Sequence, residues 1–162
     1  MPEITVLGVG NILLQDEGFG VRVIEAIREM YRFIPDIQVL DGGTLGLELL
    51  PYLIDTDKLI IVDAVAGSLA PGEFYHFRHT EAAAYFNASL SLHELGIREV
   101  LAGLEILEKP VTDLVVFGIQ PASLKTGLEL STLIKSKVMP MTKNIIEQLQ
   151  DWNVEVRPLE EH

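Results

Sequence analysis

Short apolar runs alternate along the chain with segments whose apolar residues recur at helical spacing. Residues 3–9, 58–64 and 112–119 are nearly continuous runs of β-forming apolar residues, which is typical of strands covered on both faces. Residues 37–41 (IQVLD) predict a further strand. Residues 17–32 predict a helix, because their apolar side chains recur at helical spacing, namely Val21, Ile24, Ile27, Met30 and Tyr31.

Three further helices follow in the pattern. Thr44 can cap one that runs through Pro51 or beyond, because its side-chain oxygen can accept a hydrogen bond from a free N–H of the first turn. Residues 92–107 predict the second. Residues 130–151 predict a long C-terminal helix, and Pro140 inside it predicts a kink because proline has no N–H for the helical hydrogen bond.

The remaining strand patterns decide the topology of the sheet. Residues 72–78 (GEFYHFR) follow Pro71-Gly72 so closely that no crossover helix fits before them, which favours an antiparallel edge strand. Residues 154–158 (VEVRP) can form a short final strand. The alternation of strands and helices implies a parallel, right-handed sheet. We therefore predict an α/β fold: a three-layer sandwich around a doubly wound, mainly parallel sheet with one antiparallel edge strand, in a single domain over residues 1–162.

Composition and charge exclude several classes of protein. The formal net charge of −12 argues against binding to nucleic acid or to anionic membrane surfaces. No apolar run approaches the roughly 18 residues that span a bilayer, and the N-terminus lacks the pattern of a signal peptide. The chain has no cysteine, which removes disulfides, thiolate metal sites and a cysteine nucleophile. We expect a cytoplasmic protein that binds neither nucleic acid nor membrane.

The first turn joins a buried strand to a helix start, a shape typical of dinucleotide-binding folds. Its glycine pattern, GVG at residues 8–10, fits that fingerprint, but Leu13 stands where the third glycine belongs. Asp16 and Glu17 occupy the helix start, where they would repel a pyrophosphate and could instead hold a metal cation. Asp41 resembles the acid that binds ribose in such folds, so a nucleotide-binding oxidoreductase stays an open alternative.

Four side chains with metal-binding or acid–base chemistry are expected at one edge of the sheet. Ligands of doubly wound sheets bind beyond the carboxyl ends of the strands. The residues at these positions are Glu17, Asp41, Asp63 and His93. An aspartate directly after the apolar run LIIV is costly unless it is paired or liganded, which singles out Asp63.

The acids also have a purely structural interpretation. Glu17 can complement a helix dipole, and Asp16 can cap the same helix. Asp41 and Asp63 can be turn residues at the ends of their strands. Only the set taken together points to a metal site.

His93 lies in a capping box, residues 91–94, so it falls in the first turn of its helix. The helix dipole there favours the neutral imidazole, which is the form that binds metals, although a lone surface histidine is the default interpretation. The dipeptide His93-Glu94 also begins a zinc-protease HExxH motif, but Ile97 stands where the second histidine should be.

Five blocks of the chain resemble, in order and at plausible spacing, the [NiFe]-hydrogenase maturation proteases, in the branch that processes uptake-type hydrogenases. The blocks are LGVGNILLQDEGFGVRVIEAI, VLDGGTLGLELL, LIIVDAV, SLHELGI and VVFGIQP. The opening block, with the pattern GVGN-I-L-L-x-D-E-G-x-G, is quite specific. The resemblance covers nearly the whole chain and is looser between Phe77 and Leu92.

The resemblance implies an endopeptidase that removes a short C-terminal peptide from a hydrogenase large-subunit precursor after nickel insertion. It assigns Glu17, Asp63 and His93 to a metal site. Nickel is expected to arrive with the precursor, and another divalent ion such as zinc or cadmium can substitute. Two carboxylates and an imidazole suit such ions and leave coordination positions open for a substrate or water.

The resemblance also bears on the catalytic group and the partner. Asp41 matches a family acid of less settled role, and Asp41 or Asp16 can serve as the base of an aspartyl-type peptidase. The expected partner is the large-subunit precursor, and the protease is expected to be a monomer. A non-catalytic nickel-binding maturation factor would use the same ligands, so it stays a second alternative.

Overall fold

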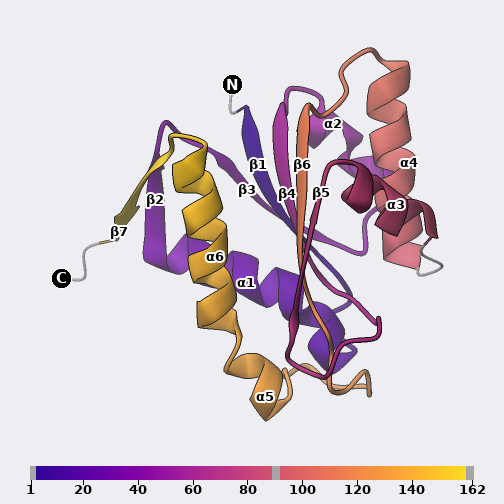
Figure 1. Ribbon diagram of the computed structural model, residues 1–162, viewed down its shortest axis with the longest axis vertical. Helices are drawn as coiled ribbons and strands as arrows, with labels where there is room; N and C mark the ends of the chain where they lie inside the picture. Colours follow the sequence, from indigo (N-terminus) through magenta and orange to yellow (C-terminus); the bar gives the residue numbers. More distant parts are fainter. Residues whose placement is uncertain (1–2, 89–91, 160–162) are drawn as a thin grey trace.

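A twisted sheet with helices packed on both faces forms the centre of the molecule (Figure 1). The computed structural model describes residues 3–88 and 92–159, without the side chains of residues 92 and 93. The sheet contains β1 (Ile4–Val9), β3 (Gln38–Gly43), β4 (Lys58–Ala64), β5 (Phe74–Arg78) and β6 (Asp113–Ile119). Their order is β3-β1-β4-β6-β5, with four parallel strands and β5 antiparallel to β6 at one edge. The predicted fold class, including its antiparallel edge strand, is confirmed.

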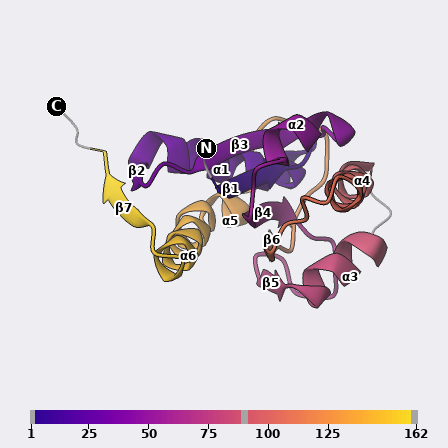
Figure 2. The same ribbon diagram turned by 90° about the horizontal axis from the view of Figure 1, so that it is seen from above.

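Four longer helices complete the sandwich: α1 (Phe19–Met30), α3 (Thr80–Ala88), α4 (Leu92–Ile106) and α6 (Val138–Asp151). Figure 2 shows α1 and α6 on one face of the sheet and α3 and α4 on the other. Alternate residues of each strand therefore enter different cores. In β4, Ile60 and Val62 pack toward α1 and α6, whereas Leu59 and Ile61 pack toward α3 and α4. All four side chains are fully buried, which is why this strand shows no polar alternation in the sequence.

The N-terminus of α1 lies very close to the sheet. A Cβ at Gly20 would lie 2.2 Å from the carbonyl oxygen of Val62 and 2.6 Å from that of Val9. A Cβ at Gly8 would lie 2.3 Å from the carbonyl oxygen of Gly20. Only glycine permits such an approach of backbone to backbone. It seats η1 (Gln15–Gly18), the 3-10 turn before α1, at the carboxyl edge of the sheet and against β4.

The helix predicted over residues 17–32 is shorter than expected, because it ends at Met30 and a strand follows. This strand, β2 (Tyr31–Ile34), pairs with β7 (Glu155–Pro158), the expected final strand, in a separate two-stranded antiparallel sheet. Phe33 of β2 is buried in the core that α1 and α6 share. The tertiary packing of this side chain overrides the helical spacing that continues into the segment.

The helix expected to start at Thr44 begins later and is broken. Gly46 precedes the 3-10 turn η2 (Leu47–Leu49), which leads into the short helix α2 (Leu50–Leu53). Thr44 is therefore not its cap. Pro51 lies in the first turn of α2, where its missing N–H costs no hydrogen bond.

The predicted C-terminal helix is two helices. The short helix α5 (Thr132–Lys135) ends before α6 begins at Val138. Pro140 lies in the first turn of α6, where backbone N–H groups have no acceptor within the helix. The proline therefore belongs to a helix start, and the predicted kink was wrong.

Helix α3 was not predicted. Its sequence, TEAAAYFNA, is rich in alanine, the strongest helix former, and it buries Ala82 and Phe86 against the sheet. Among the described residues, none of the helices has the length and apolarity to cross a membrane.

Candidate active site at the carboxyl edge of the sheet

The loops that follow β1, β3, β4 and β6 gather at the carboxyl edge of the parallel sheet, the lower end of the molecule in Figure 1. Glu17 lies in η1, which packs against β4. Asp63 is the second-last residue of β4. The structure thus brings together the two elements that carry the predicted carboxylate ligands.

Asp63 is fully buried and is held by a side chain from the helix layer. Its Oδ2 accepts a hydrogen bond of 3.1 Å from the hydroxyl of Tyr85 in α3. The same hydroxyl contacts Oε1 of Glu94, a residue of the first turn of α4 that is only 7% exposed. Tyr85 therefore connects the end of β4 to the start of α4.

Tyr85 stays a hydrogen-bond donor at neutral pH. Burial raises the pKa of the Tyr85 hydroxyl, and the negative charges of Asp63 and Glu94 raise this pKa further. A protonated phenol can donate to a carboxylate and fix its orientation, as the outer-shell partners of metal ligands do. Tyr85 was not among the predicted site residues, because nothing in the local sequence distinguishes a tyrosine that reaches a strand end from one that packs in the core.

His93 belongs to the same first turn of α4 by its backbone position, since α4 begins at Leu92. Its side chain, and Ser91 of the predicted capping box, lie outside the described residues. Among the described side chains, which exclude His93, no group of three or more potential ligands is arranged to hold a metal ion. The set of Glu17, Asp63 and His93 therefore stays a prediction, with its two carboxylates on neighbouring elements.

Asp16 is fully buried, and both of its carboxylate oxygens accept hydrogen bonds from the loop after β6. Oδ2 accepts from the N–H groups of Ala122 and Ser123 at 2.9 and 2.8 Å, and from the Ser131 hydroxyl at 2.8 Å. Oδ1 accepts from the N–H of Ser131 at 2.7 Å. These bonds make Asp16 an anchor between two loops, and a role as catalytic base would have to compete with them.

Asp41 is exposed and points away from Asp63. It shares a face of the sheet with Val39, which packs toward α1, whereas Asp63 shares a face with Ile61, which packs toward α4. Its Oδ1 accepts a hydrogen bond of 2.9 Å from the N–H of Gly43, as a turn-forming aspartate does. The structure therefore places Asp41 at the predicted edge but does not bring its side chain together with Asp63.

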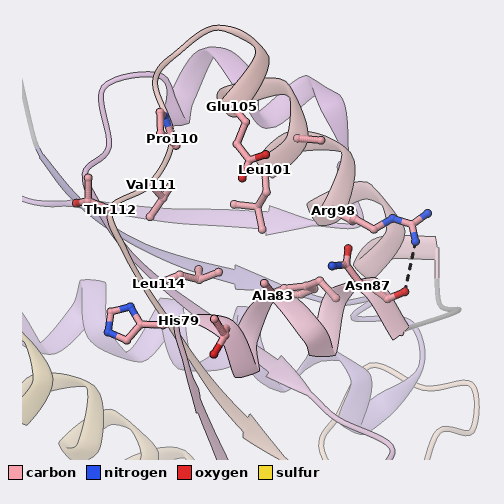
Figure 3. Close-up of a pocket in the computed structure, with 13 residues that line it drawn as sticks. His79, Ala83, Asn87, Arg98, Leu101, Glu105, Pro110, Val111, Thr112 and Leu114 are labelled. Atoms are coloured by element: carbon pink, nitrogen blue, oxygen red, sulfur yellow. Dashed lines mark hydrogen bonds between the residues drawn. The ribbon is translucent and has the colours of Figure 1, made fainter.

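A hollow lies between α3 and α4, against the start of β6 (Figure 3). It measures about 420 Å³ and is bordered by His79, Arg98 and the segment from Pro110 to Leu114. The Arg98 guanidinium donates to the carbonyl of Asn87 across its rim, at 3.5 Å. One end of the hollow lies at the start of β6, at the amino edge of the sheet, and its other end lies at Asn87 and Arg98. Neither Glu17 nor Asp63 lines it.

Comparison with known proteins decides the family. Residues 21–148 match a family model described as hydrogenase maturation protease. The chain belongs to this family. The maturation protease is 38% identical over 159 residues to the hydrogenase 2 maturation protease of Escherichia coli, a match that covers 97% of this chain and 96% of the relative.

Solved structures agree with this assignment. The hydrogenase maturating endopeptidase HybD from Escherichia coli has a TM-score of 0.92 with this maturation protease, at 37% identity and 98% coverage of both chains. A more distant structure, the [NiFe] hydrogenase maturation protease HybD from Thermococcus kodakarensis, has a TM-score of 0.74 at 27% identity, over 92% of this chain and 99% of that one. The resemblance seen in the sequence is confirmed, and so is the prediction that this protein is an endopeptidase, a hydrolase of peptide bonds.

Proposed function

We propose that this protease removes the C-terminal peptide of a nickel-loaded [NiFe]-hydrogenase large-subunit precursor, and that Glu17, Asp63 and His93 bind the nickel that the precursor carries. The protease acts in the cytoplasm as a monomer, and the metal serves first as the feature by which the precursor is recognised. Membership of the hydrogenase maturation proteases supports the reaction. The metal site is inferred from the positions and the chemistry of Glu17, Asp63 and His93.

The observation that carries the metal proposal is the burial of Asp63. A carboxylate removed from water destabilises the protein unless a hydrogen bond, an opposite charge or a metal compensates for it. Tyr85 supplies one hydrogen bond to Oδ2, on the side of the helix layer. The carboxylate also lies where parallel sheets bind ligands, beside the turn that carries Glu17.

The chemistry of the three residues fits a nickel-sized or zinc-sized ion. Two carboxylate oxygens and an imidazole nitrogen form a site for a borderline divalent metal and leave positions open for a substrate group. The start of α4 favours the neutral form of His93, which is the form that donates to a metal. Nickel bound next to the scissile carbonyl would polarise it or activate a water molecule.

Asp41 and Asp16 are the candidate bases of this proposal. Asp41 is the more accessible of the two to water, because its side chain is exposed whereas Asp16 is fully buried, but Asp41 lies on the face of the sheet opposite Asp63.

The test is a cleavage assay with purified nickel-loaded precursor, read by mass spectrometry for the loss of the C-terminal peptide. We expect Glu17→Gln, Asp63→Asn and His93→Ala to abolish cleavage. Glu29→Gln is the matched control, because Glu29 is an exposed glutamate farther along α1. Full cleavage by the Glu17→Gln and His93→Ala proteins would remove the metal site from the mechanism. A wild-type protein that binds the precursor without cleaving it would instead be a nickel-binding maturation factor.

A further inference from the structure

Two loops at the carboxyl edge, residues 10–18 and 120–131, expose four large apolar side chains. We call these two segments the paired loops. The exposed fractions are 37% for Ile12, 55% for Leu13, 46% for Leu124 and 58% for Leu128. Isolated exposed leucines are common on protein surfaces, but four on two adjoining loops form a local concentration.

Hydrogen bonds hold the paired loops to each other. The N–H of Gly127 donates to the carbonyl of Leu13 at 2.8 Å, and the N–H of Gln15 donates to the carbonyl of Gly127 at 2.9 Å. The buried carboxylate of Asp16 adds the four bonds described above. The guanidinium of Arg22 in α1 donates to the carbonyl of Leu128 at 2.8 Å.

This arrangement holds apolar side chains in solvent-exposed positions. A flexible loop could fold its leucines inward, whereas the paired loops cannot do so without breaking the hydrogen bonds that join them, including those of the buried Asp16 carboxylate. An apolar surface that is held in place but left uncovered is typical of a surface that another protein covers. Preorganised loops also lose less conformational entropy when the partner binds.

We propose that the paired loops form the surface on which the hydrogenase large-subunit precursor docks. The proposal rests on the proposed function. Its first support is continuity, because residues 10–18 include η1 and hence Glu17, so that the first of the paired loops is itself part of the candidate site.

Charge is the second support. Glu17 is a half-buried acid within the first of the paired loops, and η1, which carries it, packs against β4. An acid within an apolar surface suits a partner that presents a divalent cation at the contact. A second copy of this chain fits less well, because each copy carries a formal net charge of −12 and two copies would repel each other. Asp16 is, in this view, a positioning residue that keeps the two loops in register.

The chain offers a closely matched control. Leu107 is 46% exposed, as is Leu124, but it follows α4 at the opposite edge of the sheet. We would measure the Kd of the intact protease for immobilised nickel-loaded precursor by biolayer interferometry, and KM and kcat for cleavage in solution. Thermal unfolding of each variant checks that its fold is intact.

We expect the double variant Leu124→Ser/Leu128→Ser to raise both Kd and KM about tenfold, because two partly exposed leucines lose their apolar contacts with the precursor. Its kcat and thermal midpoint should equal those of the wild type, and Leu107→Ser should change none of these quantities. A Kd of the double variant equal to that of Leu107→Ser would overturn the proposal.

The remaining outcomes separate this proposal from the alternatives. If sedimentation shows a wild-type dimer that the double substitution dissociates, the paired loops are an interface between copies and the proposal is overturned. If the wild type binds the precursor without cleaving it and the double variant binds more weakly, the docking surface is supported while the proposed cleavage fails.

Discussion

Replacement of Asp16 by alanine should destabilise the protein far more than replacement of an exposed acid at the same edge. Asp16 is fully buried and accepts four hydrogen bonds, three of them from backbone N–H groups. Asp16→Ala leaves all four donors without this acceptor. Removing one partner from a buried, charged network costs about 3–5 kcal/mol. At roughly 2–4 °C per kcal/mol for a chain of this size, the thermal midpoint should fall by about 10 °C.

The measurements are thermal unfolding and urea unfolding, both followed by circular dichroism, with the urea midpoint and slope fitted separately for each variant. Asp41→Ala is the control, because Asp41 is exposed and accepts a bond only from Gly43 among the hydrogen bonds described; it should cost about 1 kcal/mol or less. Hydrogen exchange of the Ser131 amide should also rise in Asp16→Ala. Equal midpoints for Asp16→Ala and Asp41→Ala would refute the anchoring role of Asp16.

Three further substitutions test other parts of the structure. Tyr85→Phe removes the hydroxyl that bonds Asp63 and should weaken nickel binding, measured by calorimetry, by roughly 10-fold to 100-fold; an unchanged affinity would mean that Tyr85 does not orient a ligand. His76 is an exposed side chain whose partial desolvation, aided by the charge of Arg78, lowers its pKa from the ordinary value of 6.5, so the unfolded chain binds this proton more readily than the folded one. Wild-type stability relative to His76→Phe, which can still stack on Phe117, should therefore decline as the pH falls through 6.5 and below; a parallel pH dependence in both proteins would contradict this. Gly20→Ala should lower the free energy of unfolding by about 3 kcal/mol or more, because its Cβ would collide with backbone oxygens; a neutral effect would show that α1 can move away at little cost.

Local sequence patterns predicted those parts of the fold that need only an apolar neighbour and no particular partner residue. Strand β4 was predicted with the bounds that it has in the structure, since any strand buried between two helix layers must be apolar throughout. The same logic singled out Asp63, because a charge at the end of such a run needs compensation. Tyr85, which provides part of that compensation, lies 22 residues away and carries no local mark of its role.

The anchoring role of Asp16 could not be predicted from its neighbouring residues either. The interpretation of Asp16 as a helix cap considered only neighbouring residues, whereas its hydrogen-bond donors lie at least 106 positions farther along the chain. The separation of Asp41 from Asp63 depends on the pairing of β3 and β4 with β1, since the register decides which face a side chain takes. The sequence predicted the topology of the sheet and the edge at which Asp41 and Asp63 lie. It did not predict which face of the sheet each side chain takes, because that depends on the pairing of three strands.

The glycine contact between α1 and the sheet also determines when the site can exist during synthesis. Gly20 packs directly on the carbonyl of Val62, so η1 reaches its place only once β4 has entered the sheet. A nascent chain that has left the ribosome only as far as α1 therefore contains Glu17 but not the strand that positions it. Residues of the first turn of α4 emerge later still. The candidate site is therefore complete only when β4 and α4 have both joined the fold, late in the synthesis of the chain.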